Sequence, residues 1–504
     1  MLRALTATPR RAAERLALYV ASMAVLAACA GAPSYQPPRV RVAPAYEGTT
    51  ERAKVQSQNG AVAARSLSAV PSTSHSAAFT PTLSVVPFWQ SLGDTTLTQL
   101  IEAALRDGTD ISAAEARLVS ARASRRLSTF DLAPTITAVG SAMRQQSSIA
   151  QVPGLTSRLP QRDLWDVGFD ASWELDIFGR VGRSVGARSA FTDAAEHGLD
   201  DVQVILAAEV ARTYFDMRGS QRQLAVALRN ADNQRRTVDL TEDRLTAGRG
   251  TAFDTERAKS VLQLTLAAVP AIESRISADR HRIATLLGRP ANALPATLRA
   301  DGELPALPDT VHVGSPGELV RRRPDVRSAE RAAAAQGLLV GAAQADYLPR
   351  LSIGASVGYA ASSFDSLSRS GTSRMLVGPV LSWPLLDLGR VRSRVDIARA
   401  QEDEARSRYD AVVLRALEET ETAIVTYDRA HSRLAILTQA VESSSRAAEL
   451  ARQRFEAGLT DFLQVLDAQR TQLDAENQLA QAHTTAAVAL VALYKATGGT
   501  WPVR

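Results

Sequence analysis

The sequence predicts a mixed α and β membrane protein made of two internal repeats, with four membrane strands per chain and long helices. Three observations carry this prediction. The chain begins with a segment typical of an export signal, which ends at its single cysteine. Two pairs of segments alternate apolar and polar residues. Two stretches, residues 179–247 and 389–457, contain no proline, and each would form a helix of roughly 100 Å at 1.5 Å per residue.

The amino terminus has the layout of a bacterial lipoprotein signal. Four arginines precede the apolar run "LALYVASMAVLAA", which is too short to span a membrane. The residues "LAAC", Leu26 to Cys29, resemble a lipobox, in which the cysteine is lipidated. We therefore expect residues 1–28 to be a lipoprotein signal peptide and residues 29–87 a lipidated, extended segment. An unmodified cysteine inside an ordinary signal is the alternative. Ala30, rather than an aspartate, favours delivery to the outer membrane.

Composition argues against an enzyme or a nucleic-acid-binding protein. The net charge is only +5, and the arginines are interleaved with acidic residues, as on a solvated helix surface. The sequence contains no nucleophile elbow, phosphate loop or zinc motif. One cysteine cannot form a disulfide framework. The histidines do not fall at metal-ligand spacing, so we expect no metal and no cofactor: His75, His197, His281, His312, His431 and His483.

An internal repeat organises the chain from residue 88 onward. "DISAAEARL" (110–118) aligns with "DVRSAERAA" (325–333), and "RLTAG" (244–248) aligns with "RFEAG" (454–458). Trp173 and Gly179 match Trp383 and Gly389. Each repeat reads helix, strand, strand, long helix, turn, helix. We therefore place the first repeat at 88–300 and the second at 301–504.

Four segments are expected to be strands, at about 135–146, 163–176, 349–360 and 374–385. In the second of them, Trp165, Phe169 and Trp173 lie on one face, and Asp166 and Asp170 lie on the other. Such ten-residue alternation is typical of transmembrane strands. A soluble half-buried sheet produces the same pattern, but the export signal and the long helices favour the membrane.

Two helical hairpins are expected, at about 178–288 and 389–497. Gly248 and Gly458 end their first helices, as a helix C-terminus prefers. Between the repeats, Ser315, Pro316 and Glu318 predict a capped helix start. We expect the arginines of the following "RRRP" to be exposed or paired rather than an anion site. A coiled-coil rod would explain the hairpins but not the strands.

Four strands cannot close a barrel, because an open sheet edge in lipid leaves backbone groups unpaired. Single-chain barrels begin at about eight strands, so partner copies are required. Three copies supply twelve strands. That number is enough to close around a water-filled lumen, and the product would be a membrane pore extended by a helical tunnel roughly 100 Å long.

The chain resembles the TolC-like outer-membrane factors, especially their NodT/OprM-type lipoprotein branch, which serves resistance–nodulation–division efflux systems. The resemblance covers roughly residues 86–501 and rests on "WELDIFGR", "AVPAIESRISADRHRIATLLGR", "VGSPGELVRRRPDVRSAER", "GPVLSWPLLDLGR", "FLQVLDAQR" and "ALYKATGG". It implies a trimeric 12-stranded outer-membrane β-barrel, with four strands per chain, continuous with a long periplasmic α-helical barrel. This homotrimer would conduct drugs or other small molecules passively from an inner-membrane transporter and a periplasmic adaptor to the exterior. The resemblance also implies a lipid-anchored protein in contact with outer-membrane lipid.

Two other functions remain open at this stage. One is the outer-membrane exit channel of a type I protein-secretion system, which shares the architecture. The other is a purely structural coiled-coil lipoprotein. The lipobox and "RRRPDVRSAER" favour small-molecule efflux, and the exported substrates cannot be read from the chain.

The resemblance also implies where the channel narrows. The turns at 244–258 and 454–468 correspond to the periplasmic tip of the family, where an adaptor docks at Gly248, Thr251, Gly458 and Thr460. Leu463, Asp467 and Asp254 match its constriction. The chain departs from TolC at Phe455, Thr460 and Gln464, where TolC has tyrosine, arginine and aspartate. A hydrophobic constriction by Leu463 is therefore expected in place of the polar lock.

Overall fold

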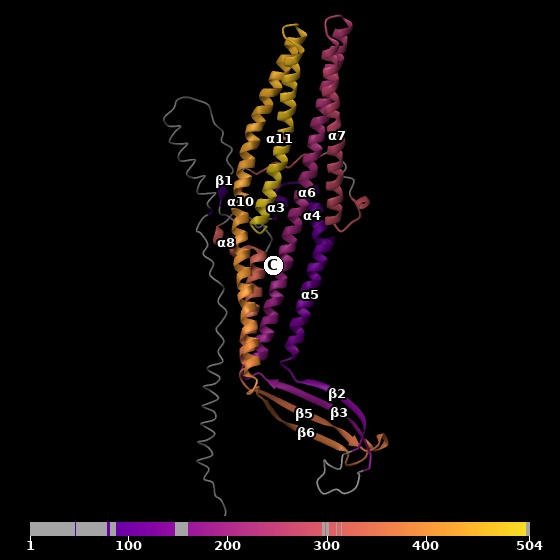
Figure 1. The fold of residues 1–504 in the computed structure, drawn as a ribbon, viewed down its shortest axis with the longest axis vertical. Coiled ribbons are helices and arrows are strands. Elements are labelled where there is room, and N and C mark those ends of the chain that lie inside the picture. The colour runs from indigo at the N-terminus through magenta and orange to yellow at the C-terminus, as the bar shows by residue number, and fades with distance from the viewer. Residues whose placement is uncertain are drawn as a thin grey trace, which may run out of the picture. The chain divides into compact units, whose positions relative to one another are not determined.

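The computed structural model describes residues 46, 78–80, 87–146, 160–294, 298, 302–308, 310–313 and 315–499 (Figure 1). The expected signal peptide, the lipidated Cys29 and nearly all of the expected extended segment lie outside these residues. The described chain divides into two compact units. The sheet unit contains Arg117–Ala195 and Ser328–Tyr409, and the hairpin unit contains the remaining described residues. Each unit takes residues from both sequence repeats.

The sheet unit contains one four-stranded antiparallel sheet (Figure 1). Its strands are β2 (Thr135–Gln145), β3 (Arg162–Leu175), β5 (Arg350–Ala361) and β6 (Ser373–Ser382), in the order β2-β3-β5-β6. The pairing of β3 with β5 joins the hairpins of the two repeats. Strand β6 ends at Ser382, short of the expected 385, because Pro384 has no N–H to continue a ladder.

The sheet has one apolar face, which a single chain leaves exposed. Phe169, Val357 and Met375 lie side by side across β3, β5 and β6, and they are 57%, 53% and 79% exposed. Contiguous apolar surface of this kind marks an interaction or membrane-facing site. The opposite face carries Asp166 and Asp170 of β3 and Ser356 of β5, with the apolar Leu376 and Val380 on β6. Among the described residues, β2 and β6 each pair on one side only.

The repeated tryptophans, Trp173 and Trp383, make equivalent hydrogen bonds at the helix-side end of each strand pair. Trp173 Nε1 donates a hydrogen bond to the carbonyl oxygen of Leu132 at 3.0 Å. Trp383 Nε1 donates to the carbonyl oxygen of Tyr347 at 3.1 Å. In both repeats the acceptor lies in the turn just before the pair's first strand. The repeated sequence motif thus encodes a repeated junction between helix and strand.

The hairpin unit is built from long antiparallel helices. Helices α6 (Arg180–Thr246) and α10 (Leu388–Glu456), whose first parts belong to the sheet unit, turn back into α7 (Ala252–Leu286) and α11 (Phe462–Ala496). Two further helices flank the main core, α3 (Phe88–Ser91) and α4 (Thr95–Asp107). Buried Tyr214 of α6 donates to Asp94 at 2.7 Å, and Asp94 caps α4. No helix in the described part of the chain is long and apolar enough to cross a membrane.

Shorter elements connect the repeats. Helix α5 (Thr109–Phe130) precedes β2, and α9 (Pro324–Ala345) precedes β5. Strand β1 (Ala78–Thr80) pairs in parallel with β4 (Thr310–His312). Two short 3₁₀ helices are also present among the described residues, η2 (Ala291–Ala293) and η4 (Phe364–Ser366). Helix α8 (Pro316–Arg322) begins at the expected capping box of Ser315 and Glu318, which is confirmed.

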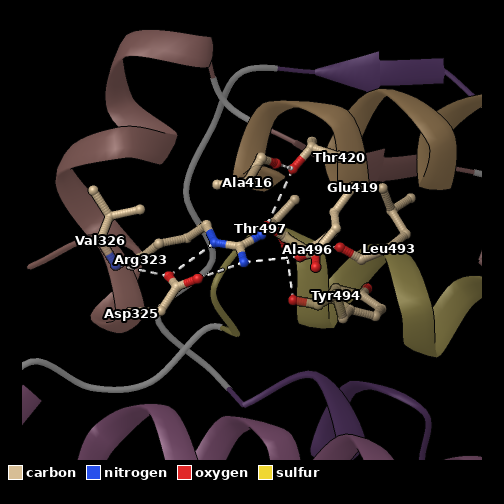
Figure 2. A network of polar contacts seen from close by, with 10 residues as sticks. All are labelled: Arg323, Asp325, Val326, Ala416, Glu419, Thr420, Leu493, Tyr494, Ala496 and Thr497. Carbon is tan, nitrogen blue, oxygen red and sulfur yellow. Dashed lines mark hydrogen bonds and ion pairs between the residues drawn. The ribbon is translucent and has the colours of Figure 1, made fainter. Parts of the chain in front are cut away.

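Arg323 ties three segments of the hairpin unit together (Figure 2). Its guanidinium contacts the Asp325 carboxylate through Nε and Nη2 at 3.0 and 2.7 Å, and Nη2 also reaches Glu419 of α10 at 2.8 Å. Nη1 donates to the carbonyl oxygen of Ala496, at the end of α11, at 2.9 Å. The side chain is only 9% exposed. The expectation of a paired arginine is confirmed for this residue.

Replacing Arg323 with alanine should therefore destabilise the hairpin unit. The change leaves the partly exposed carboxylates of Asp325 and Glu419 without their cation and the Ala496 carbonyl oxygen without its donor. Leaving such partners unsatisfied costs about 1–3 kcal/mol. We expect a lower midpoint for thermal loss of helical circular dichroism. Arg321→Ala, at an exposed position of the same run, is the matched control. Equal midpoints for the two variants would contradict the structural role of the network.

Candidate functional site

The two hairpin turns have the same backbone geometry. Gly248 has a φ of +65° and Gly458 a φ of +74°, a left-handed conformation that glycine adopts without strain. After each glycine, the next N–H reaches back across the helix end: Arg249 to the carbonyl of Arg244, and Leu459 to that of Arg454, both at 2.8 Å. The turns are therefore defined stops for α6 and α10.

The helix starts after these turns are capped by different residues. Thr251 accepts a hydrogen bond from the Asp254 N–H at 3.2 Å and donates its hydroxyl to the Asp254 carboxylate at 2.6 Å. In the second repeat, the cap is Asp461, which accepts from the Gln464 N–H at 3.1 Å. Thr460 hydrogen-bonds the Gln464 side chain. Asp461 is a functional cap that was not among the predicted residues, although it lies 210 positions after Thr251, the offset of the repeat.

A cavity of about 450 Å³ lies between the two turns. It brings together four of the expected tip and constriction residues: Asp254, Gly458, Thr460 and Leu463. A second groove of about 850 Å³, between α6, α7 and α11, is lined by Leu463 and Asp467 together with Arg257 and Arg470. Leu463 thus belongs to both hollows. Gly248 and Thr251 line neither of them.

Leu463 and Asp467 are four residues apart and share one face of α11. Leu463 is 51% exposed and Asp467 is also exposed. Among the ion pairs between described residues, none involves Asp467.

A ring contact within the second hairpin and a cation–ring contact between the two hairpins lie beside the cavity. Phe455 of α10 is buried, and its ring centre lies 5.5 Å from that of Phe462 in α11. The Arg244 guanidinium of α6 lies 4.0 Å from the Phe455 ring centre, a distance at which a cation is attracted to an aromatic face. From the sequence, Phe455 was noted only because it replaces the tyrosine that TolC has at this position, and no contact was predicted for it. The repeated Arg in "RLTAG" and "RFEAG" was the available signal for Arg244.

Charged pairs reinforce the helices near the turns. Lys259 of α7 contacts Glu242 of α6 at 2.9 Å, and hydrogen bonding to Glu242 raises the pKa of the Lys259 ammonium. On α10, hydrogen bonds from Arg452 and Gln453 lower the pKa of the Glu449 carboxyl. Both shifts favour the charged form, so Lys259 and Glu449 are charged near neutral pH. Within the described residues, no cluster of three or more His, Cys, Asp or Glu could hold a metal ion.

An exposed apolar sheet face and long paired hairpins define a class, the outer-membrane channels that combine a membrane sheet with helical hairpins. The chain belongs to the outer membrane efflux protein family, whose sequence profile matches residues 100–289 and 316–499. The predicted outer-membrane factor of an efflux pump, located in the outer membrane with a periplasmic helical part, is thereby confirmed.

Individual relatives agree with this assignment. The chain is 30% identical over 417 residues to the solvent efflux pump outer membrane protein SrpC of Pseudomonas putida. The matched region covers 81% of this chain and 86% of SrpC. It is 29% identical to nodulation protein T of Rhizobium leguminosarum bv. trifolii, over 79% of this chain and 85% of the relative. The solved outer-membrane channel OprN superposes with a TM-score of 0.83 at 36% identity, covering 94% and 100% of the two chains.

Replacing Phe455 with alanine should loosen the hairpin tips. The change removes a buried ring from the contact with Phe462 and Arg244, a truncation that typically costs about 3–5 kcal/mol. We expect faster protease cleavage at residues 247–251 and 457–461 of the purified protein. Phe253→Ala removes an exposed ring at the same end of the hairpins and is the control. Equal cleavage rates in the two variants would contradict the role of Phe455 in stabilising the hairpin tips.

Proposed function

We propose that three copies of this chain form the exit duct of a tripartite resistance–nodulation–division efflux pump, which passively conducts small molecules across the outer membrane. The observation that carries the proposal is the four-stranded sheet with an exposed apolar face and with β2 and β6 at its edges. In lipid, unpaired edge groups cost several kcal/mol each. Pairing β2 of one copy with β6 of the next removes every edge when three copies close twelve strands.

The partners follow from the same assignment. The relative SrpC is named as part of a solvent efflux pump, which supports a periplasmic adaptor and an inner-membrane transporter for this chain. The efflux relatives favour small molecules over the type I secretion alternative. We also propose that Cys29 carries the lipid anchor, since "LAAC" has the lipobox pattern. The duct itself performs no catalysis.

The hairpin turns are the proposed periplasmic tip. Leu463, Asp467 and Asp254 form the constriction, and Gly248, Thr251, Gly458 and Thr460 present the surface to the adaptor. The exposure of Leu463 and Asp467 on one face of α11 supports this placement. Three Leu463 side chains would form an apolar ring, and three Asp467 carboxylates a ring that attracts cations.

Detergent-extracted protein tests the duct directly. We expect a heat-modifiable trimer that forms ion channels in planar lipid bilayers, and a gene deletion that sensitises cells to toxic small molecules. An elongated, non-conducting dimer would instead identify a structural rod. Normal drug tolerance together with loss of a secreted protein would identify a protein-secretion channel.

Replacing Asp467 with alanine should raise the conductance of the closed trimer and weaken its block by multivalent cations, because the acidic ring is removed. Single-channel recording in planar bilayers measures both. Asp474→Ala, which removes the same charge two turns farther along α11 and lines the same groove, is the matched control. Conductance and block that stay at their original values in Asp467→Ala would exclude this residue from the gate.

A further inference from the structure

The polar face of the sheet carries a bridge of charged groups that spans three strands. Arg374 of β6 contacts both carboxylate oxygens of Asp166 in β3, with Nε at 2.7 Å from Oδ2. Its Nη1 also hydrogen-bonds the hydroxyl of Ser356 in β5. Ser356 in turn donates to the Asp170 carboxylate at 2.7 Å. The bridge therefore runs from the second repeat across to the first.

Two glycines clear the path of this arginine. In the strand register, Arg374 lies directly opposite Gly358, and Gly358 lies directly opposite Gly168. A Cβ on Gly168 would lie 2.4 Å from the Val357 carbonyl oxygen, and one on Gly358 would lie 2.4 Å from the Val167 carbonyl oxygen. The row has no side chain between Arg374 and β3, so the guanidinium can extend across β5 to Asp166.

The charges along the bridge do not cancel. The two-point contact with Asp166 neutralises Arg374, whereas Asp170 is exposed and has the Ser356 hydroxyl as its described hydrogen-bond partner. Among the ion pairs between described residues, none includes Asp170. The two carboxylates and the one guanidinium of this bridge, Asp166, Asp170 and Arg374, therefore sum to one negative charge per chain.

We infer that Asp170 is a cation-selectivity residue inside the membrane part of the channel, and that the bridge from Arg374 fixes the charge around it. The inference rests on the proposed trimeric duct. Phe169, Val357 and Met375 are on the opposite, apolar face, which must meet the lipid, so Asp166, Asp170 and Arg374 face the water of the lumen. Three copies place three uncompensated carboxylates at one level, a ring that favours small cations over anions.

The reversal potential under a KCl gradient in planar bilayers tests this inference, at low ionic strength because salt screens the ring. Asp170→Asn should lower the ratio of K⁺ to Cl⁻ permeability by about a factor of two. Arg374→Gln should raise it, because Asp166 then loses its counter-charge. The permeability ratio is thus expected to fall in one variant and to rise in the other. If the bridge were only structural, both variants would lose stability and their permeability ratios would not move in opposite directions. Measuring both variants also in the Asp467→Ala background separates this ring from the tip.

Asp365→Asn is the control, since it removes an exposed carboxylate from the turn between β5 and β6. A shift in Asp365→Asn as large as that in Asp170→Asn would overturn the inference, because any nearby charge would then act equally. Channels with an unchanged reversal potential in Asp170→Asn would also overturn it, even if Arg374→Gln did not assemble. Absence of channels in the unmodified protein would instead overturn the proposed function.

Discussion

The pairing of backbone hydrogen-bonding groups in lipid is the constraint on which the rest of the structure depends. The sheet contains four strands, and its edge strands β2 and β6 have no further partner in the described part of the chain. The exposed row of Phe169, Val357 and Met375 adds an apolar surface that water does not favour. One chain therefore has an unpaired edge on β2 and another on β6. In the proposed trimer, β2 of each copy pairs with β6 of the next copy, so that no edge remains unpaired.

The same constraint explains why the chain repeats itself. Each repeat provides one strand pair and one helical hairpin, and Trp173 and Trp383 close equivalent junctions by donating to Leu132 and Tyr347. The two strand pairs nevertheless meet in one sheet, through the pairing of β3 with β5. Duplication in the sequence thus provides equivalent elements, and strand pairing combines two of them in a single sheet.

Polar contacts decide how these equivalent elements differ. Arg323 joins α10, the end of α11 and the segment before α9, although it stands in a run of three arginines of which only it is buried. Thr251 and Asp461 cap equivalent helices with different side chains. Arg374 reaches Asp166 only because Gly358 and Gly168 lie in its path. Such contacts give each repeat its own role on a shared backbone.

The sequence by itself determined the elements whose signals are local. Period-two alternation, proline-free stretches, the Ser315 capping box and the glycines after α6 and α10 each depend on near neighbours along the chain, so strands, hairpins and turns could be predicted from them. Three features could not be predicted in this way: the partners of Arg323, the packing of Phe455 on Phe462 and Arg244, and the Arg374 bridge. They join residues far apart in sequence, and only the tertiary structure decides which distant side chains meet, because register and helix packing set those distances.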